Sequence, residues 1–209
     1  MSITAEPVAR MGKRARAKEA NRNAIIEAAR AVFARIGYDA ANIRDIIRET
    51  DLASGTFYNY FKSKEEVFEA LADDAVKRIR PLLRQANEES VDLESYLLAA
   101  YGAYFSFLAE ENNEAIAHDM PHMTLVGVRV DTPEMETLSD EIRADLERVL
   151  EKVGLDHIDS DYLTAAAIGV AREMGDHMLK RRPVDAAGAA KFATKLILAG
   201  TEALAKSER

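Results

Sequence analysis

The chain has 209 residues, no cysteine and a net charge of −8, and 48% of its residues are hydrophobic. It can bury a core, but it cannot form disulfides, thiolate metal sites or a cysteine nucleophile. Its apolar runs are too short to span a bilayer, and no signal-peptide core follows the N-terminus. These features predict a soluble, cytoplasmic protein.

The charge is distributed unevenly along the chain. Residues 1–64 carry 12 Lys/Arg and 7 Asp/Glu, whereas residues 65–209 carry 16 and 29. A basic region inside an acidic protein can attract a polyanion, although uneven surface composition would give the same numbers. Residues 1–20 lack apolar periodicity and are basic, so we expect a flexible arm that is either solvated or inserted into a minor groove.

The first predicted helix begins near Asn23 and stops at Gly37, because apolar residues recur there at helical spacing. Asn42 is a predicted N-cap of the next helix, with Asp45 at its third position to favour the helix dipole. Asp51 suits the turn that follows, because aspartate tolerates left-handed backbone better than most residues.

A short helix is expected over residues 54–60. Ser63 and Glu66 then match a capping box, and the helix that follows is expected to end or kink near Pro81. Helical periodicity continues to the end of the sequence, with no alternation typical of strands. The predicted fold class is all-α, with long helices over residues 93–108, 132–153, 161–180 and 185–205.

Residues 42–61 read as two short helices around a tight turn, which is typical of a helix-turn-helix. Phe57, Tyr60 and Phe61 share one side of the second helix and would pack on the first. The opposite side carries small or polar residues, so the wall of a DNA groove could approach it closely.

The run Gly55-Thr56-Phe57-Tyr58-Asn59-Tyr60-Phe61-x-Ser63-Lys64-Glu65 resembles the signature of the TetR family of repressors. The resemblance covers about residues 22–70. It departs from the family pattern at Asp51, where glycine is usual, and at Ala53, where serine or threonine is usual. Ala53 cannot cap a helix with its side chain, so we expect Ser54 to do so one residue later.

This resemblance implies a helix-turn-helix DNA-binding domain over residues 21–67 and a ligand-sensing and dimerisation domain over residues 68–209. It also implies a ligand-responsive transcriptional regulator, most often a repressor, that binds palindromic double-stranded operator DNA as a homodimer. An activator of the same fold remains an alternative.

The predicted DNA-binding residues lie on both helices of the motif and just beyond them. By the resemblance, Arg44, Ser54, Gly55 and Thr56 approach base edges, and Tyr58, Tyr60 and Lys64 contact phosphates. Asn59 and Lys62 share the exposed side of the second helix. Arg44 could read guanine bidentately, and Lys64 stands at a helix start, where a phosphate can be held. Alternatively, these are ordinary surface charges and amphipathic tyrosines.

The acidic remainder is expected to hold a hydrophobic or aromatic effector. Aromatic and methionine side chains gather on its helices, although core residues would show the same pattern. The predicted ligand-binding residues are Tyr101, Tyr104, Phe105, Leu108, Met123, Met174 and Met178, together with His118, His122 and His177.

His118 and His122 form one i, i+4 pair, and Glu173 and His177 form another. Two such pairs could meet on a divalent ion, or the imidazoles could anchor a ligand, or they could be ordinary histidines. We expect neither a metal nor a cofactor.

Small residues in the last two helices would permit close approach of a second copy in a four-helix bundle, although they could equally pack within one chain. They are Ala165, Ala166, Gly169, Ala171 and Gly175 on one helix, and Gly188, Ala189, Ala193, Ala199 and Gly200 on the other.

The sequence contains no glycine-rich phosphate loop and no nucleophile elbow, so we expect no enzyme activity. Two other classes stay open at this point. A metal hydrolase could be built on the two histidine pairs, and a DNA-packaging protein would bind all sequences with equal affinity.

Overall fold

The computed structural model describes residues 12–88, 90–117 and 132–207, and in these ranges the chain consists of helices, turns and loops without a strand. The all-α class is therefore confirmed. None of the described helices is long and apolar enough to cross a membrane. The helices are α1 (Lys13–Ile36), α2 (Ile43–Arg48), α3 (Ser54–Phe57), α4 (Lys64–Glu88), α5 (Leu93–Glu111), α6 (Asn113–Ala117), α7 (Pro133–Lys152), α8 (Ser160–Leu179) and α9 (Ala186–Ser207).

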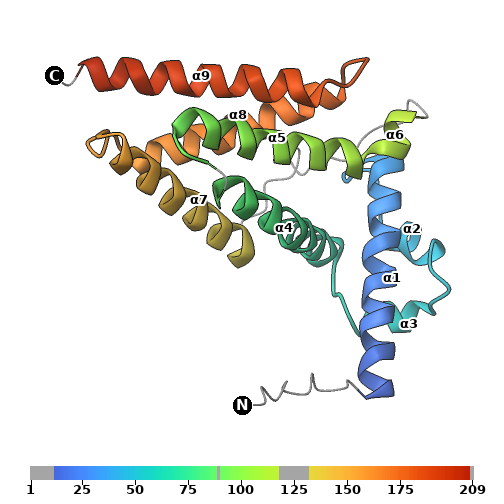
Figure 1. Ribbon diagram of the computed structural model, residues 1–209. Helices are drawn as coiled ribbons and strands as arrows, with labels where there is room; N and C mark the ends of the chain where they lie inside the picture. Colours follow the sequence, from blue (N-terminus) through green and yellow to red (C-terminus); the bar gives the residue numbers. More distant parts are fainter. Residues whose placement is uncertain (1–11, 89, 118–131, 208–209) are drawn as a thin grey trace, which may run out of the picture.

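The described helices form two groups joined by α4 (Figure 1). In the first group, the short helices α2 and α3 lie beside the long α1. In the second group, α5 packs on α4, α8 and α9, while α7 packs on α4 and α8. Helix α9 forms one outer edge of this second group (Figure 1).

Each group has its own apolar core. The first is built around fully buried residues such as Ile25, Ile46 and Phe57, and α4 adds its first turns to it through Phe68. The second is built by α5, α7, α8 and α9 around residues such as Phe105. The predicted division of the chain between residues 67 and 68 falls inside α4, which carries the polypeptide from one core to the other.

Several predicted helix limits are confirmed by their caps. Gly37 ends α1 with φ of 79°, a backbone conformation that glycine adopts without steric cost. Asn42 caps α2, and Thr132 caps α7 with proline at the first helical position. In each case the side chain or backbone at the helix end satisfies polar groups that the helix leaves unpaired.

The structure corrects one expectation about a helix end and narrows another. Residues 13–20 are not an arm but the first turns of α1, because lysine, arginine, alanine and glutamate extend an existing helix at little cost. Of the two alternatives expected at Pro81, an end or a kink, the end is excluded, because α4 continues to Glu88. Ile79 before the proline and Ala86 after it are both buried, so tertiary packing holds the helix together on either side.

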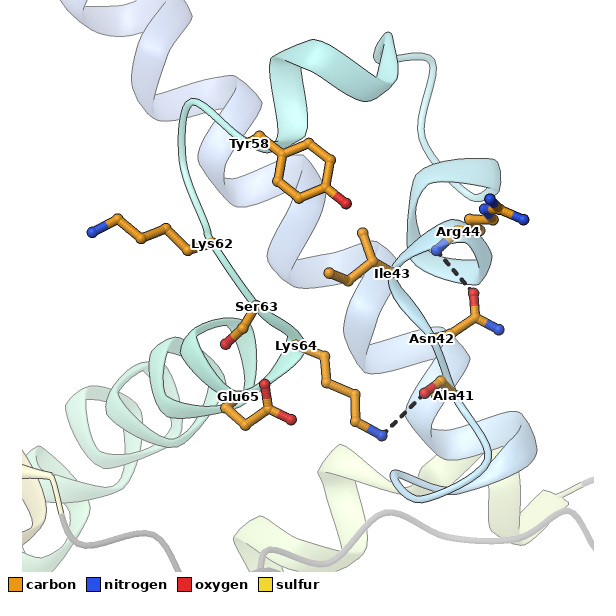
Figure 2. Close-up of a pocket in the computed structure, with 9 residues that line it drawn as sticks. All are labelled: Ala41, Asn42, Ile43, Arg44, Tyr58, Lys62, Ser63, Lys64 and Glu65. Atoms are coloured by element: carbon orange, nitrogen blue, oxygen red, sulfur yellow. Dashed lines mark hydrogen bonds between the residues drawn. The ribbon is translucent and has the colours of Figure 1, made fainter.

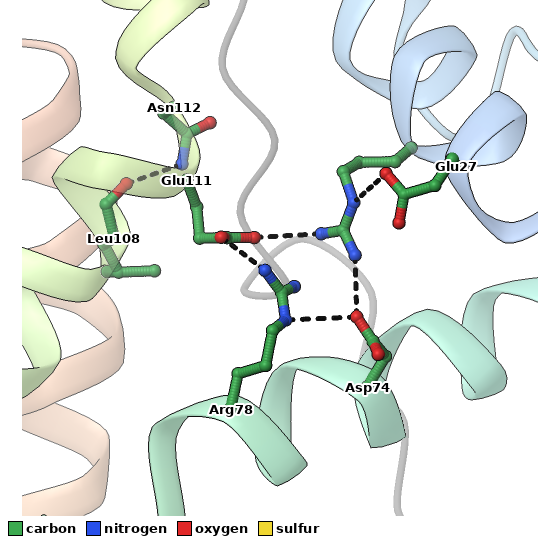
Figure 3. Close-up of polar contacts among 7 residues, drawn as sticks. Glu27, Asp74, Arg78, Leu108, Glu111 and Asn112 are labelled. Atoms are coloured by element: carbon green, nitrogen blue, oxygen red, sulfur yellow. Dashed lines mark hydrogen bonds and ion pairs between the residues drawn. The ribbon is translucent and has the colours of Figure 1, made fainter. Parts of the chain in front are cut away.

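A cluster of charged side chains joins the two groups (Figure 3). Arg30 of α1 contacts Asp74 of α4 at 2.9 Å and Glu111, at the end of α5, at 3.0 Å. Arg78 of α4 pairs with the same two carboxylates. The side chains of Arg30 and Glu111 are only 20% and 24% exposed, so water screens their attraction less than it would at the surface. The cluster fixes α1 relative to α4 and α5.

Candidate nucleic-acid interface

The start of α2 is set by a reciprocal capping box. The side-chain oxygen of Asn42 accepts hydrogen bonds from the backbone N–H groups of Arg44 and Asp45, at 2.9 and 3.2 Å. The Asp45 carboxylate accepts from the N–H of Asn42 at 3.0 Å. With the helix start fixed in this way, Ile46 faces the core at 0% exposure and Arg44 faces outward.

The turn between α2 and α3 is held by Thr50. Its hydroxyl donates to the carbonyl of Ile47 at 2.9 Å and accepts from the N–H of Leu52 at 3.3 Å. Helix α3 then begins at Ser54, with Ala53 at the N-cap and no side-chain cap. The expectation that Ser54 caps this helix is wrong, because Ser54 is already its first residue.

Helix α3 is short, and residues 58–60 continue it as a hydrogen-bonded turn. Phe57 anchors it in the core at 1% exposure, and Tyr60 packs partly against the same cluster. Of the remaining predicted residues of this segment, Ser54, Gly55, Tyr58 and Asn59 are exposed and Thr56 is half-buried. A Cβ atom built on Gly55 would meet no atom within 4 Å, so a partner can come close to this part of α3.

An open depression lies between α2, α3 and the start of α4 (Figure 2). Arg44 and Lys62 stand on opposite sides of it, with the ring of Tyr58 between them (Figure 2). All three side chains are exposed, and Tyr58 shows 57% of its surface. Neither Arg44 nor Lys62 forms a side-chain ion pair or hydrogen bond within the described residues. The depression therefore offers two unneutralised cations and a phenol beside the outer side of α3.

Lys64 lines the same depression, but its ammonium group turns into the fold. It donates to the carbonyl oxygens of Tyr38 at 2.9 Å, Ala41 at 3.1 Å and Asp39 at 3.4 Å. Its Nζ also lies 4.4 Å from the centre of the Tyr38 ring, a cation–π distance. Lys64 thus ties the start of α4 to the loop that precedes α2. The predicted phosphate contact of this residue has to compete with these bonds.

A second link joins the same two segments. The hydroxyl of Tyr38 donates to a carboxylate oxygen of Glu65 at 3.1 Å. Burial, reinforced by this hydrogen bond and by the charge of Glu65, raises the pKa of Tyr38 to about 12. The pKa of Glu65 is lowered, chiefly by a hydrogen bond from its own backbone N–H and by one from Ser63. At neutral pH the phenol of Tyr38 therefore stays protonated and the carboxyl group of Glu65 stays ionised, as this hydrogen bond requires.

The structure brings together most of the described residues that were predicted to bind an effector. Tyr101 and Phe105 of α5 stack with ring centres 5.9 Å apart, and the Tyr101 hydroxyl donates to the carbonyl of Ala167 in α8 at 3.1 Å. Both rings belong to the core of the second group, as does Met178. Tyr104, Leu108 and Met174 pack against it and are half-buried. Burial raises the pKa of Tyr104 to about 12, so its phenol stays protonated.

Of the histidines predicted to bind the effector, the structure describes only His177. His177 and Glu173 are exposed, and neither belongs to this core or packs against it. His118, His122 and Met123 lie outside the described residues. In the described ranges, no group of three or more histidine, aspartate or glutamate side chains is arranged to hold a metal ion.

Sequence reasoning missed three features of this region. Thr50 holds the turn, Arg22 covers the ring of Phe61 with its guanidinium carbon 5.4 Å from the ring centre, and Lys64 bonds to a loop about 25 residues before it. Of these, only Thr50 has a local signal, since threonine often bonds to backbone groups in turns. The other two contacts depend on how separate helices pack.

Residues 25–71 match the family described as bacterial regulatory proteins, tetR family. The matched segment begins in α1, includes α2 and α3, and ends in the first turns of α4. It therefore contains every residue that lines the depression.

Solved structures with the same fold extend the likeness to most of the chain. The fatty acid degradation regulator FadR from Bacillus halodurans is 23% identical with a TM-score of 0.65, over 86% of this chain and 95% of that one. FadR from Bacillus subtilis in complex with stearoyl-CoA is 20% identical with a TM-score of 0.66, over 85% and 98%. RolR in complex with resorcinol is 22% identical with a TM-score of 0.55, over 87% and 89%.

Proposed function

We propose that this chain is a ligand-responsive repressor of the TetR family that binds palindromic operator DNA as a homodimer, because residues 25–71 match that family. The observation that carries this proposal is the depression beside α3. There, Arg44, Tyr58 and Lys62 are exposed and the two cations lack partners in the described residues. Phosphates supply most of the attraction between a protein and DNA, and exposed side chains on a helix in the major groove supply the sequence reading.

We assign the residues of the interface to two tasks. Arg44 and the N-terminal end of α3, with Ser54, Gly55 and Thr56, read base edges. Tyr58 and Lys62, with Asn59 and Tyr60 beside them, hold the phosphate backbone. Lys64 acts mainly as a positioning residue, because its bonds to the loop before α2 set the place from which Arg44 projects.

We propose that α8 and α9 form the dimer interface. Four of the large apolar side chains that stay exposed lie on these helices, namely Tyr162 at 79%, Phe192 at 64%, and Leu196 and Leu204 at 52% each. Among the small residues, Ala165, Ala166, Gly169, Ala199 and Gly200 are exposed beside them. Gly175 and Ala193 are buried within the chain instead, so the close approach they permit is intramolecular.

The effector is proposed to be a hydrophobic or aromatic small molecule that binds between α5 and α8. The aromatic and methionine side chains gathered there support this, as do the stearoyl-CoA and resorcinol named for two proteins of the same fold. A ligand shifts an equilibrium only through different affinities for the two states. We therefore propose that the effector favours a spacing of the two DNA-binding units that does not match the roughly 34 Å of one helical turn of DNA.

Selection of bound duplexes from a random DNA pool tests the proposed function. We expect recovery of a palindromic site with two half-sites about 10 base pairs apart. Recovery of no palindrome, or equal affinity for all sequences at a fixed salt concentration, would reject the repressor.

Arg44→Ala tests the assignment of the reading residue on the selected site. We expect a loss of about 1–3 kcal/mol of discrimination at particular base pairs. Arg48→Ala is the matched control, because Arg48 lies on the same helix with 78% of its side chain exposed and contacts Asp45 at 3.8 Å. An equal loss for all bases in Arg44→Ala would make Arg44 a phosphate contact.

A further inference from the structure

The first turns of α1 have no packing partner in the described structure. Residues 14–20 are all exposed, whereas Ile25 and Ala29 further along the helix are fully buried. Figure 1 shows these turns running past α3 and away from the second group of helices. A helical segment that buries nothing contributes little to the stability of the fold.

The charges of this segment are arranged by face. Arg14, Lys18 and Arg22 are spaced by four residues, so they follow one side of α1. The same side continues into Ile25 and Ala29, which pack into the core of the helix-turn-helix. The side of α1 that is apolar beside the motif thus becomes basic where the helix extends beyond it. Arg16 lies on the opposite side, two residues from both Arg14 and Lys18.

The basic side also connects directly with the candidate DNA interface. The guanidinium of Arg22 covers the ring of Phe61, and the neighbouring Lys62 lies at the edge of the depression. From Arg14 to Arg22 the helix rises about 12 Å, which is close to the width of a major groove. A duplex seated on α3 would therefore carry phosphates within reach of this side of α1.

We propose that Arg14, Lys18 and Arg22 form a second DNA contact, which holds the sugar–phosphate backbone flanking each half-site. The partner is DNA because the side is strongly cationic and continuous with the proposed interface. The contact carries no base recognition, since phosphates look alike at every sequence. It lengthens the protected region of each half-site and raises affinity for all duplexes. This inference rests on the proposed DNA binding.

The test compares Arg14→Gln/Lys18→Gln with Arg16→Gln, using the selected operator duplex over a series of salt concentrations. Each phosphate contact contributes about 0.9 to the slope of log K against log salt. We expect the double variant to reduce the slope by about 1.8 for each protomer, and Arg16→Gln to leave it nearly unchanged. Hydroxyl-radical footprints should lose protection at the outer edge of each half-site and keep it at the centre.

Equal slopes for wild type and the double variant would overturn the inference. A change of slope in Arg16→Gln as large as half of that in the double variant would overturn it too. Glutamine is a good helix former, and the substituted positions pack against nothing in the described structure, so loss of folding should not intervene. Failure of the wild-type protein to select any palindrome would reject the proposed function itself, which separates the two outcomes.

Discussion

Replacing Lys64 by methionine tests whether this side chain stabilises the fold or contacts DNA. The substitution keeps most of the length of the side chain and removes the ammonium group. It deletes hydrogen bonds to the carbonyls of Tyr38 and Ala41, at 2.9 and 3.1 Å, and a weaker one to Asp39 at 3.4 Å. The thioether can still rest against the Tyr38 ring, so part of the aromatic contact remains.

The expected cost follows from these bonds. A hydrogen bond involving a charged group contributes about 1.5–3 kcal/mol when shielded from water, but the side chain of Lys64 is only half-buried, so we discount this strongly. Two good bonds and one weak bond then amount to a loss of about 2 kcal/mol in the free energy of unfolding. For a chain of this size that corresponds to a fall in Tm of about 4–8 °C.

The assay combines thermal unfolding with operator binding at several salt concentrations. If Lys64 acts as a positioning residue, Lys64→Met lowers Tm, weakens binding moderately, and leaves the salt slope as in wild type. Lys62→Met is the control, since the exposed side chain of Lys62 forms no ion pair or hydrogen bond in the described residues. It should leave Tm unchanged and reduce the salt slope by about 0.9 for each protomer. An unchanged Tm together with a reduced slope in Lys64→Met would refute this assignment.

Three further predictions concern the rest of the chain. Leu196→Glu should convert the proposed dimer to a monomer in sedimentation, because it puts a charge into the proposed α8–α9 interface. Leu82→Glu, on a leucine 40% exposed in α4, should not. A dimeric Leu196→Glu would contradict the interface. Arg30→Met should lower the free energy of unfolding by about 2 kcal/mol, because Asp74 and Glu111 lose a partner at 2.9 and 3.0 Å; thermal unfolding measures this, and an unchanged Tm would show that the cluster does not hold α1. Asp92 is the N-cap of α5, and hydrogen bonds from Ser95 lower the pKa of its carboxyl group. The stabilising effect of the ionised carboxylate is therefore present above the pKa of the unfolded state and is lost as the pH falls through the pKa of the folded state. Asp92→Asn keeps the cap but does not titrate, so its Tm should fall less than that of wild type between pH 5 and pH 3, and identical pH profiles would contradict the assignment.

Interactions between residues close together in the sequence determine several helix ends of this protein. The capping box of Asn42, the positive φ at Gly37 and the proline after Thr132 act over a few residues, so the sequence predicted where these helices start or stop. Helical periodicity likewise predicted the all-α class, and the run from Gly55 to Glu65 resembles the signature of the family that residues 25–71 match.

Tertiary structure decided the features that depend on contacts between distant segments. Packing carries α4 through Pro81. The carbonyl oxygens of the loop after α1 accept hydrogen bonds from the ammonium group of Lys64, which the resemblance had placed against a phosphate. His177, which was predicted to bind the effector, is exposed instead of buried with the aromatic cluster. In each case the free energy of burial or of a long-range hydrogen bond outweighs the local preference, and a single sequence does not show which distant partner a side chain will meet.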